Sequence, residues 1–469
     1  MRLFPIYTWN KGVRNFGLFR RKFINLPWAQ GVILLVCVVV AMLLANLPFT
    51  RDIYHSILET DLSILFRGPD SDGFLFPKDM TVEAFINDVL MTVFFFTVGL
   101  EIRREMKCGE LSSVRKALMP VIAAAGGVLM PAAIFFLVNN GTAAASGWGI
   151  PTATDIAFAV GILSILGDKV PVSLKIFLTA LAIADDLIAI LVVALFYGGS
   201  VNLPLLGIAL ILVVAVLIMN KLGEKRPAMY LIPAFVIWVL FYYSGIHSTM
   251  SGVIMAFLVP MTPRYSRAYF NRKRRQYIKR IHEYDRIDDG EVFPNGPQRH
   301  CLRRLSALSR ETIPMSYRLE HLLGPWVNFL IMPLFALANA GVEIPDVSYF
   351  NVFHMDPSMG SVSMGIFLGL VLGKPLGIFI ASFIAVKAHA GEMPAKASWK
   401  MLFAVACLGG IGFTMSIFVD TLSFGEQAPE ITATLRDMGK VAVLMGSFCA
   451  AVLGSILINL IARIEGRKD

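Results

Sequence analysis

The sequence predicts an all-α polytopic membrane protein with about twelve transmembrane helices, from its composition and its long apolar runs. Of the 469 residues, 56% are hydrophobic and 16% are charged, and the mean hydropathy is +0.67. Soluble globular chains are about 45–50% apolar and about 25% charged, so an ordinary soluble enzyme is excluded. Disorder is excluded as well, because it requires low hydrophobicity. The runs are continuous, whereas a transmembrane β-barrel would alternate over stretches of about ten residues.

Twelve apolar runs approach the length of roughly 20 residues that a helix needs to cross a bilayer. The first run follows a basic segment and is interpreted as an uncleaved helix, because eleven more runs come after it; a cleaved signal peptide is the alternative. We expect a cytoplasmic N-terminal segment at 1–28, a twelve-helix domain at 29–462 and a cytoplasmic tail at 463–469. The expected spans are 29–47, 84–100, 117–138, 149–166, 173–197, 203–219, 228–243, 246–261, 322–342, 362–386, 400–419 and 438–462.

The charged residues predict the orientation of these spans. Loops on the side of the N-terminus carry 26 Lys and Arg residues, and loops on the other side carry 5. Because basic loops face the cytoplasm, we expect both termini inside and the loop 48–80 outside. Residues 264–320, with 14 basic and 7 acidic residues, contribute +7 of the net charge of +9. In a soluble protein this charge would suggest nucleic-acid binding; here a basic cytoplasmic insert at 262–317 is the better interpretation.

Within this insert, residues 264–286 are basic enough to form a helix on the membrane surface, attracted to anionic lipid. A solvated linker is the alternative interpretation. The five cysteines of the chain form no C-x-x-C pair. Neither a disulfide framework nor a zinc site is therefore implied, and no cofactor is expected.

Two adjacent carboxylates, Asp185 and Asp186, lie in the middle of an apolar run. A charge at the bilayer centre costs about 2.5–3.5 kcal/mol, so such residues are functional candidates. Neighbours on a helix are about 100° apart, so both side chains can face one cavity. Burial lets such a pair hold a proton near neutral pH, and after deprotonation its oxygens can bind a small cation. The pair predicts a site at which proton and cation compete; a salt-bridged structural pair is the alternative.

Two spans carry signs of interruption within the membrane. In the fourth, Pro151 removes a backbone donor and is followed by Thr154 and Asp155, which predicts a broken helix; a simple kink is the alternative. In the eleventh, three glycines at 409–412 predict a second break. These are the middle helices of spans three to five and of spans ten to twelve. Interrupted helices at matching positions indicate inverted repeats with crossing helices 4 and 11.

Lys374 lies deep in the tenth span, too far from either end for its amino group to reach water easily. It therefore needs an anionic partner, and Asp155, Asp185 and Asp186 are available. Asp155 and Lys374 could also neutralise the half-helix ends at a crossing, which carry about half a unit of charge each. Four glycines at four-residue spacing in the same span predict close helix packing.

Six stretches of the sequence resemble the NhaA-type bacterial Na+/H+ antiporter family. They follow one another in the family's order and together cover nearly the whole chain. Inverted repeats with crossing, interrupted helices are a known feature of that family. The stretches are 98–105, 153–159, 174–187, 333–341, 373–377 and 410–416.

The resemblance implies electrogenic export of Na+ or Li+ from the bacterial cytoplasm, driven by entry of more H+ than cations exported. It makes Asp186 the main carrier of cation and proton, and Asp185 the second carboxylate, paired with Lys374 in the Na+-free state. Whether Lys374 or Asp185 carries the second proton stays open. Thr154 and Asp155 lie in the crossed, unwound helices, and Thr154 joins the two carboxylates as a Na+ ligand.

The resemblance further implies regulation by pH and a homodimer that forms through the outer loop 48–80. The chain departs from the family in its inner insert, which is roughly forty residues longer and strongly basic; positive charge beside the pH-sensing mouth would lower carboxyl pKa values there. Without the resemblance, the charged residues at 101–105 would be interpreted as an ordinary surface cluster. His247, near the end of a span, would be interpreted as a structural residue. The positions that match pH-linked residues of the family are Glu101, Arg104, Glu105, His247, Glu320 and His321.

Other functional classes fit the residues less well. Intramembrane aspartyl proteases take one Asp from each of two helices, whereas both Asp residues here are adjacent. A channel is disfavoured because one paired acid site suits alternating access better than a multi-site pore. The main alternative is a Na+-coupled symporter of an organic anion on the same scaffold, which would have no need for a buried Lys374 opposite the acids.

Overall fold

The structure is a computed structural model of the chain. It describes residues 28–66, 74–77, 80–199, 201–285, 295–344, 347–353, 360–395, 397–424 and 429–465. Most of the predicted N-terminal segment 1–28 and the end of the tail 463–469 lie outside the described residues. Parts of the outer loop 48–80 and of the insert 262–317 also lie outside them.

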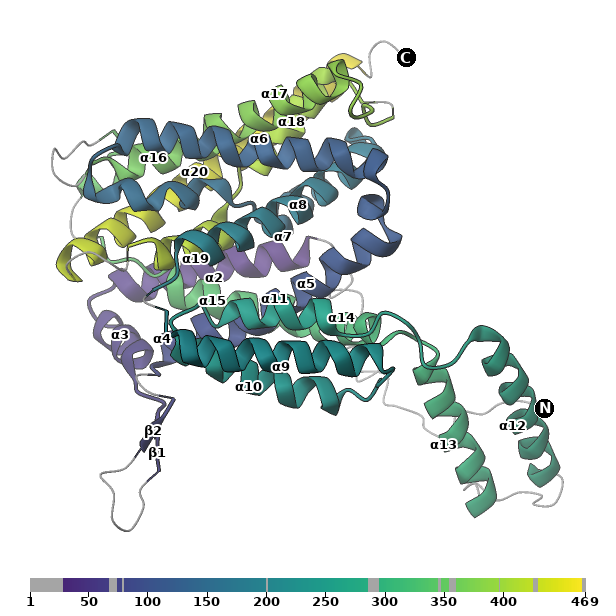
Figure 1. The fold of residues 1–469 in the computed structure, drawn as a ribbon. Coiled ribbons are helices and arrows are strands. Elements are labelled where there is room, and N and C mark those ends of the chain that lie inside the picture. Colours follow the sequence, from purple (N-terminus) through teal and green to yellow (C-terminus); the bar gives the residue numbers. More distant parts are fainter. Residues whose placement is uncertain are drawn as a thin grey trace. The chain divides into compact units, whose positions relative to one another are not determined.

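The chain divides into two compact units. Unit 1 comprises Met1–Met91, Glu105–Gly199 and Pro325–Asp469, and unit 2 comprises Thr92–Arg104 and Ser200–Gly324. Both are mainly helical, as Figure 1 shows. The helices of unit 1 are α2 (Ala29–Asn46), α3 (Arg51–Glu59), α4 (Val82–Ala84), α6 (Val114–Asn139), α7 (Ile156–Leu166), α8 (Val172–Phe196), α15 (Met332–Asn339), α16 (Val362–Leu368), α17 (Lys374–Lys387), α18 (Trp399–Gly409), α19 (Phe413–Ser423) and α20 (Pro429–Glu465).

The prediction of an all-α polytopic membrane protein is confirmed. Within the described residues, nine helical stretches are long and apolar enough to cross a membrane, and the bent pair α18 and α19 would form a tenth. Two shorter apolar helices lie at predicted spans seven and eight. The total of twelve spans and the inverted repeats stay predictions. The nine stretches are Ala29–Asn46, Val82–Cys108, Lys116–Asn139, Ala143–Leu166, Val172–Phe196, Leu203–Lys221, Met315–Asn339, Val362–Lys387 and Ile431–Glu465.

The loop 48–80 contains a feature that the sequence did not predict. Strands β1 (Ile64–Phe66) and β2 (Phe74–Phe76) pair antiparallel, with Leu65 opposite Leu75. Figure 1 shows this short hairpin beside α3 and α4. It is the only sheet within the described residues.

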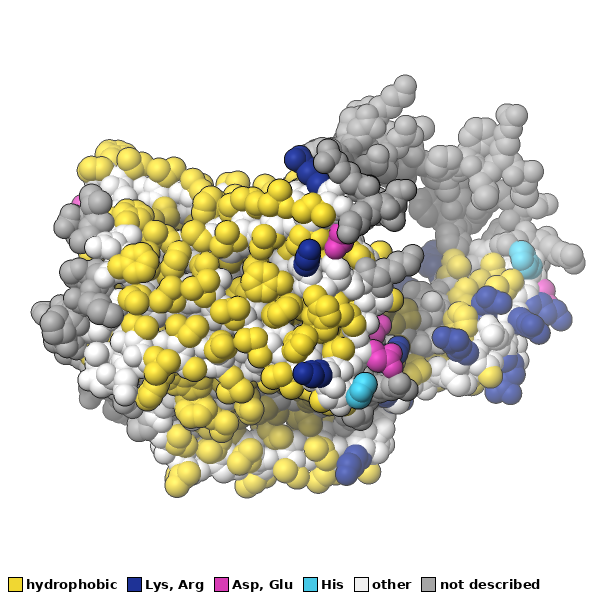
Figure 2. Space-filling view, turned by 90° about the horizontal axis from the view of Figure 1, so that it is seen from above, with side chains coloured by type: hydrophobic (Ala, Val, Ile, Leu, Met, Phe, Trp, Pro, Cys, Tyr) yellow, Lys and Arg dark blue, Asp and Glu magenta, His cyan; other side chains and the backbone are white. Residues whose placement is uncertain are grey.

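Apolar side chains cover much of the surface of unit 1. Leu137 on α6 is 80% exposed and Phe448 on α20 is 69% exposed. The face seen in Figure 2 is hydrophobic over most of its area, and the few charged side chains lie toward one end. A soluble protein rarely exposes so large an apolar area, whereas the acyl chains of a bilayer solvate it.

Four glycines bring α6 and the tenth span into close contact. A Cβ at Gly377 would clash with the backbone of Gly126 on α6, and one at Gly373 would press on the backbone of Pro131. A Cβ at Gly365 would clash with side chains of α6, and one at Gly369 would clash with the ring of Pro151. The predicted role of the glycine spacing in helix packing therefore agrees with the contacts. This packing fixes the position of Lys374, the residue after Gly373, relative to α6.

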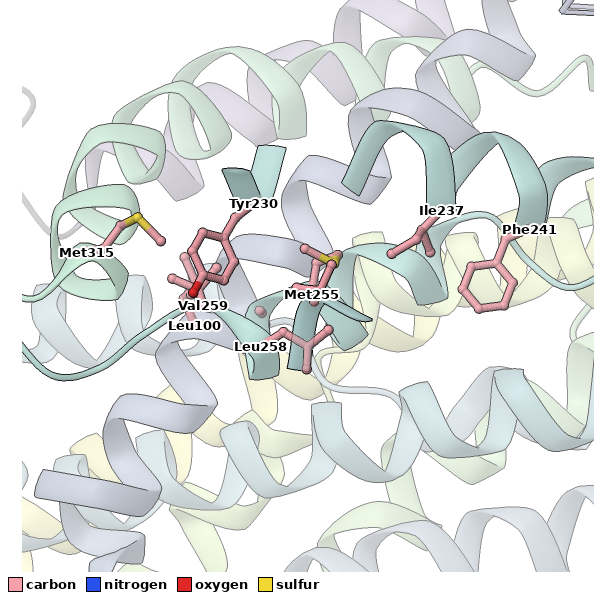
Figure 3. Packing of buried hydrophobic residues seen from close by; sticks show 10 residues of the cluster. Leu100, Tyr230, Ile237, Phe241, Met255, Leu258, Val259 and Met315 are labelled. Carbon is pink, nitrogen blue, oxygen red and sulfur yellow. The ribbon is translucent and has the colours of Figure 1, made fainter. Parts of the chain in front are cut away.

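Unit 2 is built around its own apolar core. The core joins Tyr230, Ile237 and Phe241 to Met255 and to its neighbours on the following helix, as Figure 3 shows. Its tightly buried residues include Ile237, at 0% exposed, and Met255, at 1%. The helices of this unit are α9 (Leu203–Lys221), α10 (Ala228–Ser244), α11 (Thr249–Leu258), α12 (Arg267–Asp285), α13 (Gly296–Glu311) and most of α5 (Met91–Cys108) and α14 (Met315–Trp326).

The basic insert forms two helices, α12 and α13, which lie side by side within unit 2 (Figure 1). The first coincides with the predicted basic helix at 264–286. The second was not predicted, although it begins with a capping box in which Asn295 and Gln298 satisfy each other's backbone N–H groups.

Candidate cation and proton site

The first predicted break lies between two helical segments of unit 1. A 3-10 helix, η3 (Ala143–Thr152), ends at the predicted position, and α7 begins at Ile156. Ala153 and Asp155 between them have extended backbone. Asp155 caps α7, because its Oδ1 accepts a hydrogen bond from the backbone N–H of Phe158 at 3.2 Å. The structure thus supports a broken helix rather than a kink.

The second break separates α18 from α19, whose axes differ by 47°. The two breaks contact each other: the backbone N–H of Asp155 donates to the carbonyl of Ile411 at 2.7 Å. Thr414 donates to Asp155 Oδ2 from its backbone N–H at 3.2 Å and from its hydroxyl at 2.5 Å. Asp155 therefore satisfies N–H groups at the starts of both α7 and α19, where helix ends favour negative charge.

A hydroxyl from the last helix supports the unwound segment. Ser447 Oγ on α20 accepts hydrogen bonds from the backbone N–H groups of Gly412 and Phe413 at 3.2 and 3.1 Å. Inside a membrane an unsatisfied backbone group costs several kcal/mol. Ser447 therefore makes the break between α18 and α19 tolerable.

The centre of the site is a buried ion pair. Lys374 Nζ lies 2.7 Å from Asp185 Oδ2, and the two side chains are 0% and 1% exposed. The ammonium also donates to the carbonyl of Thr152 at 2.5 Å, at the end of η3. The hydroxyl of Thr154 donates to the same Asp185 Oδ2 at 2.6 Å and lies 3.0 Å from the carbonyl oxygen of Gly409. One carboxylate oxygen thus connects α8, the tenth span and both breaks.

The other predicted carboxylate is next to this pair. Asp186 follows on α8 and is 2% exposed. Asp185 Oδ1 is buried and has no hydrogen-bond partner among the described residues. Carboxylate, hydroxyl and carbonyl oxygens are therefore gathered at one point. This set of hard oxygen atoms is of the kind that binds a small cation such as Na+.

Lys374 itself is positioned by an irregular turn. The tenth span is α-helical in α16, π-helical at η7 (Gly369–Gly373), and α-helical again from Lys374. Such π-helical turns are rare and often occur at functional sites. The sequence showed the glycines but not this turn.

A cavity of about 440 Å³ lies in unit 1 near the start of α8. Its lining includes Phe177 and Ala180 of α8 together with Glu110, Lys116 and Glu392. Ala180 is five residues before Asp185, a rise of about 7.5 Å on a helix. The cavity lies at the end of α8 that loop charge assigns to the cytoplasm. It approaches the carboxylates from that end.

The predicted pH-linked residues are only partly brought together. In unit 2, Arg104 Nε lies 2.9 Å from Glu320 Oε1, and its Nη2 lies 3.6 Å from Glu101 Oε1. The His321 ring stacks edge-on against Tyr317 at 4.1 Å between ring centroids. Arg104 thus connects two of the three predicted acids.

The remaining two pH-linked residues are Glu105 and His247. Glu105 belongs to unit 1, where its Oε2 accepts from the backbone N–H of Glu110 at 3.2 Å. His247 lies just before α11 begins, whereas Arg103, next to Arg104, bonds to carbonyls at the end of that helix. The structure therefore does not place His247 in the Arg104 cluster.

Three polar residues at the crossing were missed by sequence reasoning. Thr414 binds Asp155, Ser447 binds the second break, and Asp420 is buried on α19. Thr414 and Ser447 are small hydroxyl residues in apolar spans, where they often satisfy freed backbone groups. Asp420 could have been found as a carboxylate one residue beyond the expected end of the eleventh span.

Comparison with known proteins agrees with the geometry. A family model described as Na+/H+ antiporter 1 matches residues 21–458. A Na+/H+ antiporter NhaA of Oleidesulfovibrio alaskensis is 39% identical over 443 residues, which cover 94% of each chain. One from Syntrophobacter fumaroxidans is 42% identical over 378 residues, covering 80% of this chain and 78% of the relative. One from Proteus mirabilis is 38% identical over 440 residues, covering 94% and 96%.

Proposed function

Because the chain belongs to the Na+/H+ antiporter 1 family, whose members above are named NhaA, we propose that it exports Na+ or Li+ in electrogenic exchange for entering H+. Family membership and the apolar helices make it a multi-pass membrane protein with a role in Na+/H+ exchange. Its relatives are named as transporters, which implies that it is not an enzyme. The single observation that carries the fuller proposal is the buried Lys374–Asp185 pair beside Asp186.

The proposed exchange follows from competition for the same oxygens. With no cation bound, Lys374 neutralises Asp185. A Na+ ion that reaches Asp185 and Asp186 through the cavity takes the place of the ammonium, with Thr154 as a further ligand. A cation bound to the carboxylate oxygens favours their deprotonated form, and a proton bound there removes the charge that attracts the cation. Protons therefore leave as the cation binds and return when it departs.

Two groups compete for the role of second proton carrier. Lys374 carries it if the ammonium loses its proton when Na+ displaces it. Asp185 carries it if the lysine only releases the carboxylate. Lys374→Gln removes the first route and keeps the second, so reversal potentials of that variant against the wild type assign the role.

The Na+-coupled symport of an organic anion is the alternative function. The buried cation Lys374 argues against it, because a symporter has no need for a lysine opposite the acids. Asp185 and the Thr152 carbonyl already bind the Lys374 ammonium, so it is not free to bind an organic anion. A symporter would accumulate an anion with Na+ and would not dissipate a pH gradient. The experiment below separates the two.

We further propose that pH acts through Glu101, Arg104, Glu105, His247, Glu320 and His321. The Arg104–Glu320 contact supports this, because it joins two of these residues through opposite charges. Exchanging the two charges, as Arg104→Glu with Glu320→Arg, tests it. The double variant should recover exchange that each single variant loses, and it should shift the activating pH. Unchanged pH dependence in all three variants would contradict this role.

The remaining partners and the location are proposals as well. Both termini lie in the cytoplasm of a bacterium, and the inner membrane holds the protein. Anionic lipid contacts the basic helix α12 within 264–286, and no cofactor is needed because Na+, Li+ and H+ are cargo. The outer loop 48–80 supports a homodimer; its hairpin β1–β2 offers unpaired strand edges to a second copy.

The central experiment measures exchange in proteoliposomes. Na+ or Li+ is added to vesicles that hold a pH gradient, from acid to alkaline pH, with K+ as the control cation. Exchange with Na+ or Li+ but not K+ is expected, and Asp186→Asn should abolish it while the protein stays folded. Asp52→Asn, which removes an exposed carboxylate on α3, is the matched control and should exchange normally. Full exchange by Asp186→Asn would overturn the site assignment.

A further inference from the structure

Asp420 is a buried carboxylate that the exchange described above does not use. It lies on α19, the half helix whose start binds Asp155, and its side chain is 0% exposed. Neither of its carboxylate oxygens has a hydrogen-bond partner among the described residues. A buried carboxylate without donors is costly, so it needs a reason to be there.

One face of α19 is polar from Asp420 to the crossing. Ser416 lies one turn before Asp420, is 0% exposed, and donates to the carbonyl of Ile150 in η3 at 2.7 Å. Gly412 is packed against the Ser416 hydroxyl. Because residues four apart share a helix face, Asp420 and Ser416 line the same side. Ser423, 5% exposed, continues this polar face to the far end of α19.

That far end leads to the loop between spans eleven and twelve, which loop charge assigns to the outside. The 440 Å³ cavity lies at the start of α8, the end that loop charge assigns to the cytoplasm. Tyr197, directly after the end of α8, is within electrostatic reach of Asp420. Asp420 therefore lies on the outer side of the crossing.

The charged groups that face Asp420 come from α20. Arg436 and Lys440 act on it with positive charge, and Asp437 acts with negative charge. Gly439 on the same helix is in contact with the Asp420 carboxylate. Burial opposes the charged form of a carboxyl and nearby cations favour it, so such a site can both take up and release a proton.

We propose that Asp420 is a proton-binding residue on the outer route, which takes up a proton from external water and passes it toward Asp185 and Asp186. The proton converts the Asp420 carboxylate to the neutral acid, and the carboxylate reforms when the proton moves on. The polar face that contains Ser416 leads from Asp420 toward the crossing and gives the direction of the transfer. This inference rests on the proposed exchange of Na+ for entering H+.

The test uses the full-length protein in proteoliposomes of one orientation, with internal and external pH set separately. Asp420→Asn keeps the size of the side chain and removes the proton site. It should slow exchange by at least about tenfold when the external side is alkaline and protons are scarce. Its apparent KM for Na+ on the cytoplasmic side should stay unchanged. Asp420→Glu should restore much of the rate.

Two controls separate this role from a structural one. Asp52→Asn removes an exposed carboxylate on α3 that is not among the charged groups around Asp420, and it should keep the external pH profile. Thermal unfolding of Asp420→Asn in detergent shows whether it folds; if it does not, Asp420→Glu still tests the profile, because a longer acid should shift the dependence on external pH.

The outcomes are distinct. If wild-type protein exchanges Na+ for H+ and Asp420→Asn has the wild-type profile on both sides, Asp420 is a packing residue and the inference is wrong. A rate lowered equally at every external pH likewise contradicts it. If wild-type protein shows no exchange at all, the proposed function has failed instead.

Discussion

Lys374 lies 2.7 Å from Asp185 inside a membrane-spanning unit, and neither side chain is more than 1% exposed. The two residues are 189 positions apart in the chain and come from the fifth and tenth spans. Their pairing couples two distant segments through a charged hydrogen bond. The pair should therefore matter to stability as well as to transport.

Removal of one partner should be costly, and removal of both should cost less. Lys374→Met leaves Asp185 buried without its cation, and breaking a buried pair in this way costs about 3–5 kcal/mol. We expect a clear fall in the thermal unfolding temperature in detergent. Adding Asp185→Asn to Lys374→Met should recover a large part of the loss. If the double variant is less stable than Lys374→Met, the pair is not the source of the effect.

Thr154 should contribute to cation binding through its hydroxyl. Thr154→Val keeps the shape but removes the group that joins Asp185 to the Gly409 carbonyl. Loss of a hydrogen bond to a charged group costs about 1.5–3 kcal/mol. Initial rates of exchange should show a higher KM for Na+ at every pH. Thr154→Ser retains the hydroxyl and should stay near wild type; an equal rise in KM there would point to the lost methyl group instead.

Close packing of α6 and α17 should tolerate no side chain at Gly377. Gly377→Ala would place a methyl group against the backbone of Gly126, and overpacking of this kind costs about 1–3 kcal/mol. Thermal unfolding is the measurement. Gly207→Ala on α9 is the control, because no described atom lies within 4 Å of its added methyl group. That variant should be neutral or slightly stabilised, since Ala favours helix by about 1 kcal/mol over Gly. Equal stability of both variants would show that α6 and α17 can move apart at Gly377 to accommodate the methyl group without cost.

The turn between α9 and α10 should loosen in acid. Backbone N–H groups of Arg226 and Lys225 donate to Glu224 Oε1 at 2.9 Å each, and these bonds lower the pKa of Glu224 below its ordinary value of 4.5. A lowered folded-state pKa stabilises the turn above the unfolded-state value, and the effect is lost as pH falls through the folded-state pKa. Hydrogen exchange measures this effect. After correction for intrinsic rates, the backbone amides of Arg226 and Lys225 should become less protected as the pH falls through the folded-state pKa of Glu224. Glu224→Gln should lack this step.

The sequence was sufficient for the features that depend on composition and periodicity. The apolar runs identified the membrane helices, and Pro151 and the glycines at 409–412 located both breaks. Lys374 required an anion because a buried ammonium without a partner is costly. From the residues alone three candidates were open to it; the family resemblance implied Asp185, and the structure shows Asp185 as the direct partner.

The sequence could not show contacts between spans that are distant in the chain. The bonds from Thr414 to Asp155 and from Gly412 to Ser447 join segments with no shared periodicity. The π-helical turn before Lys374 depends on packing against α6 rather than on local propensity. The strands β1 and β2 are only three residues long, too short for an alternating pattern to be visible.

The last helix has a consequence for the membrane around it. α20 is one unbroken helix of 37 residues, about 55 Å long, whereas the hydrocarbon core of a bilayer is about 30 Å thick. The excess must project beyond the core or be absorbed by tilt. Ser447 and Gly439 couple this helix to the second break and to Asp420, so a change in tilt displaces both. The length of the surrounding acyl chains should therefore set the rate of exchange, with an optimum at one bilayer thickness.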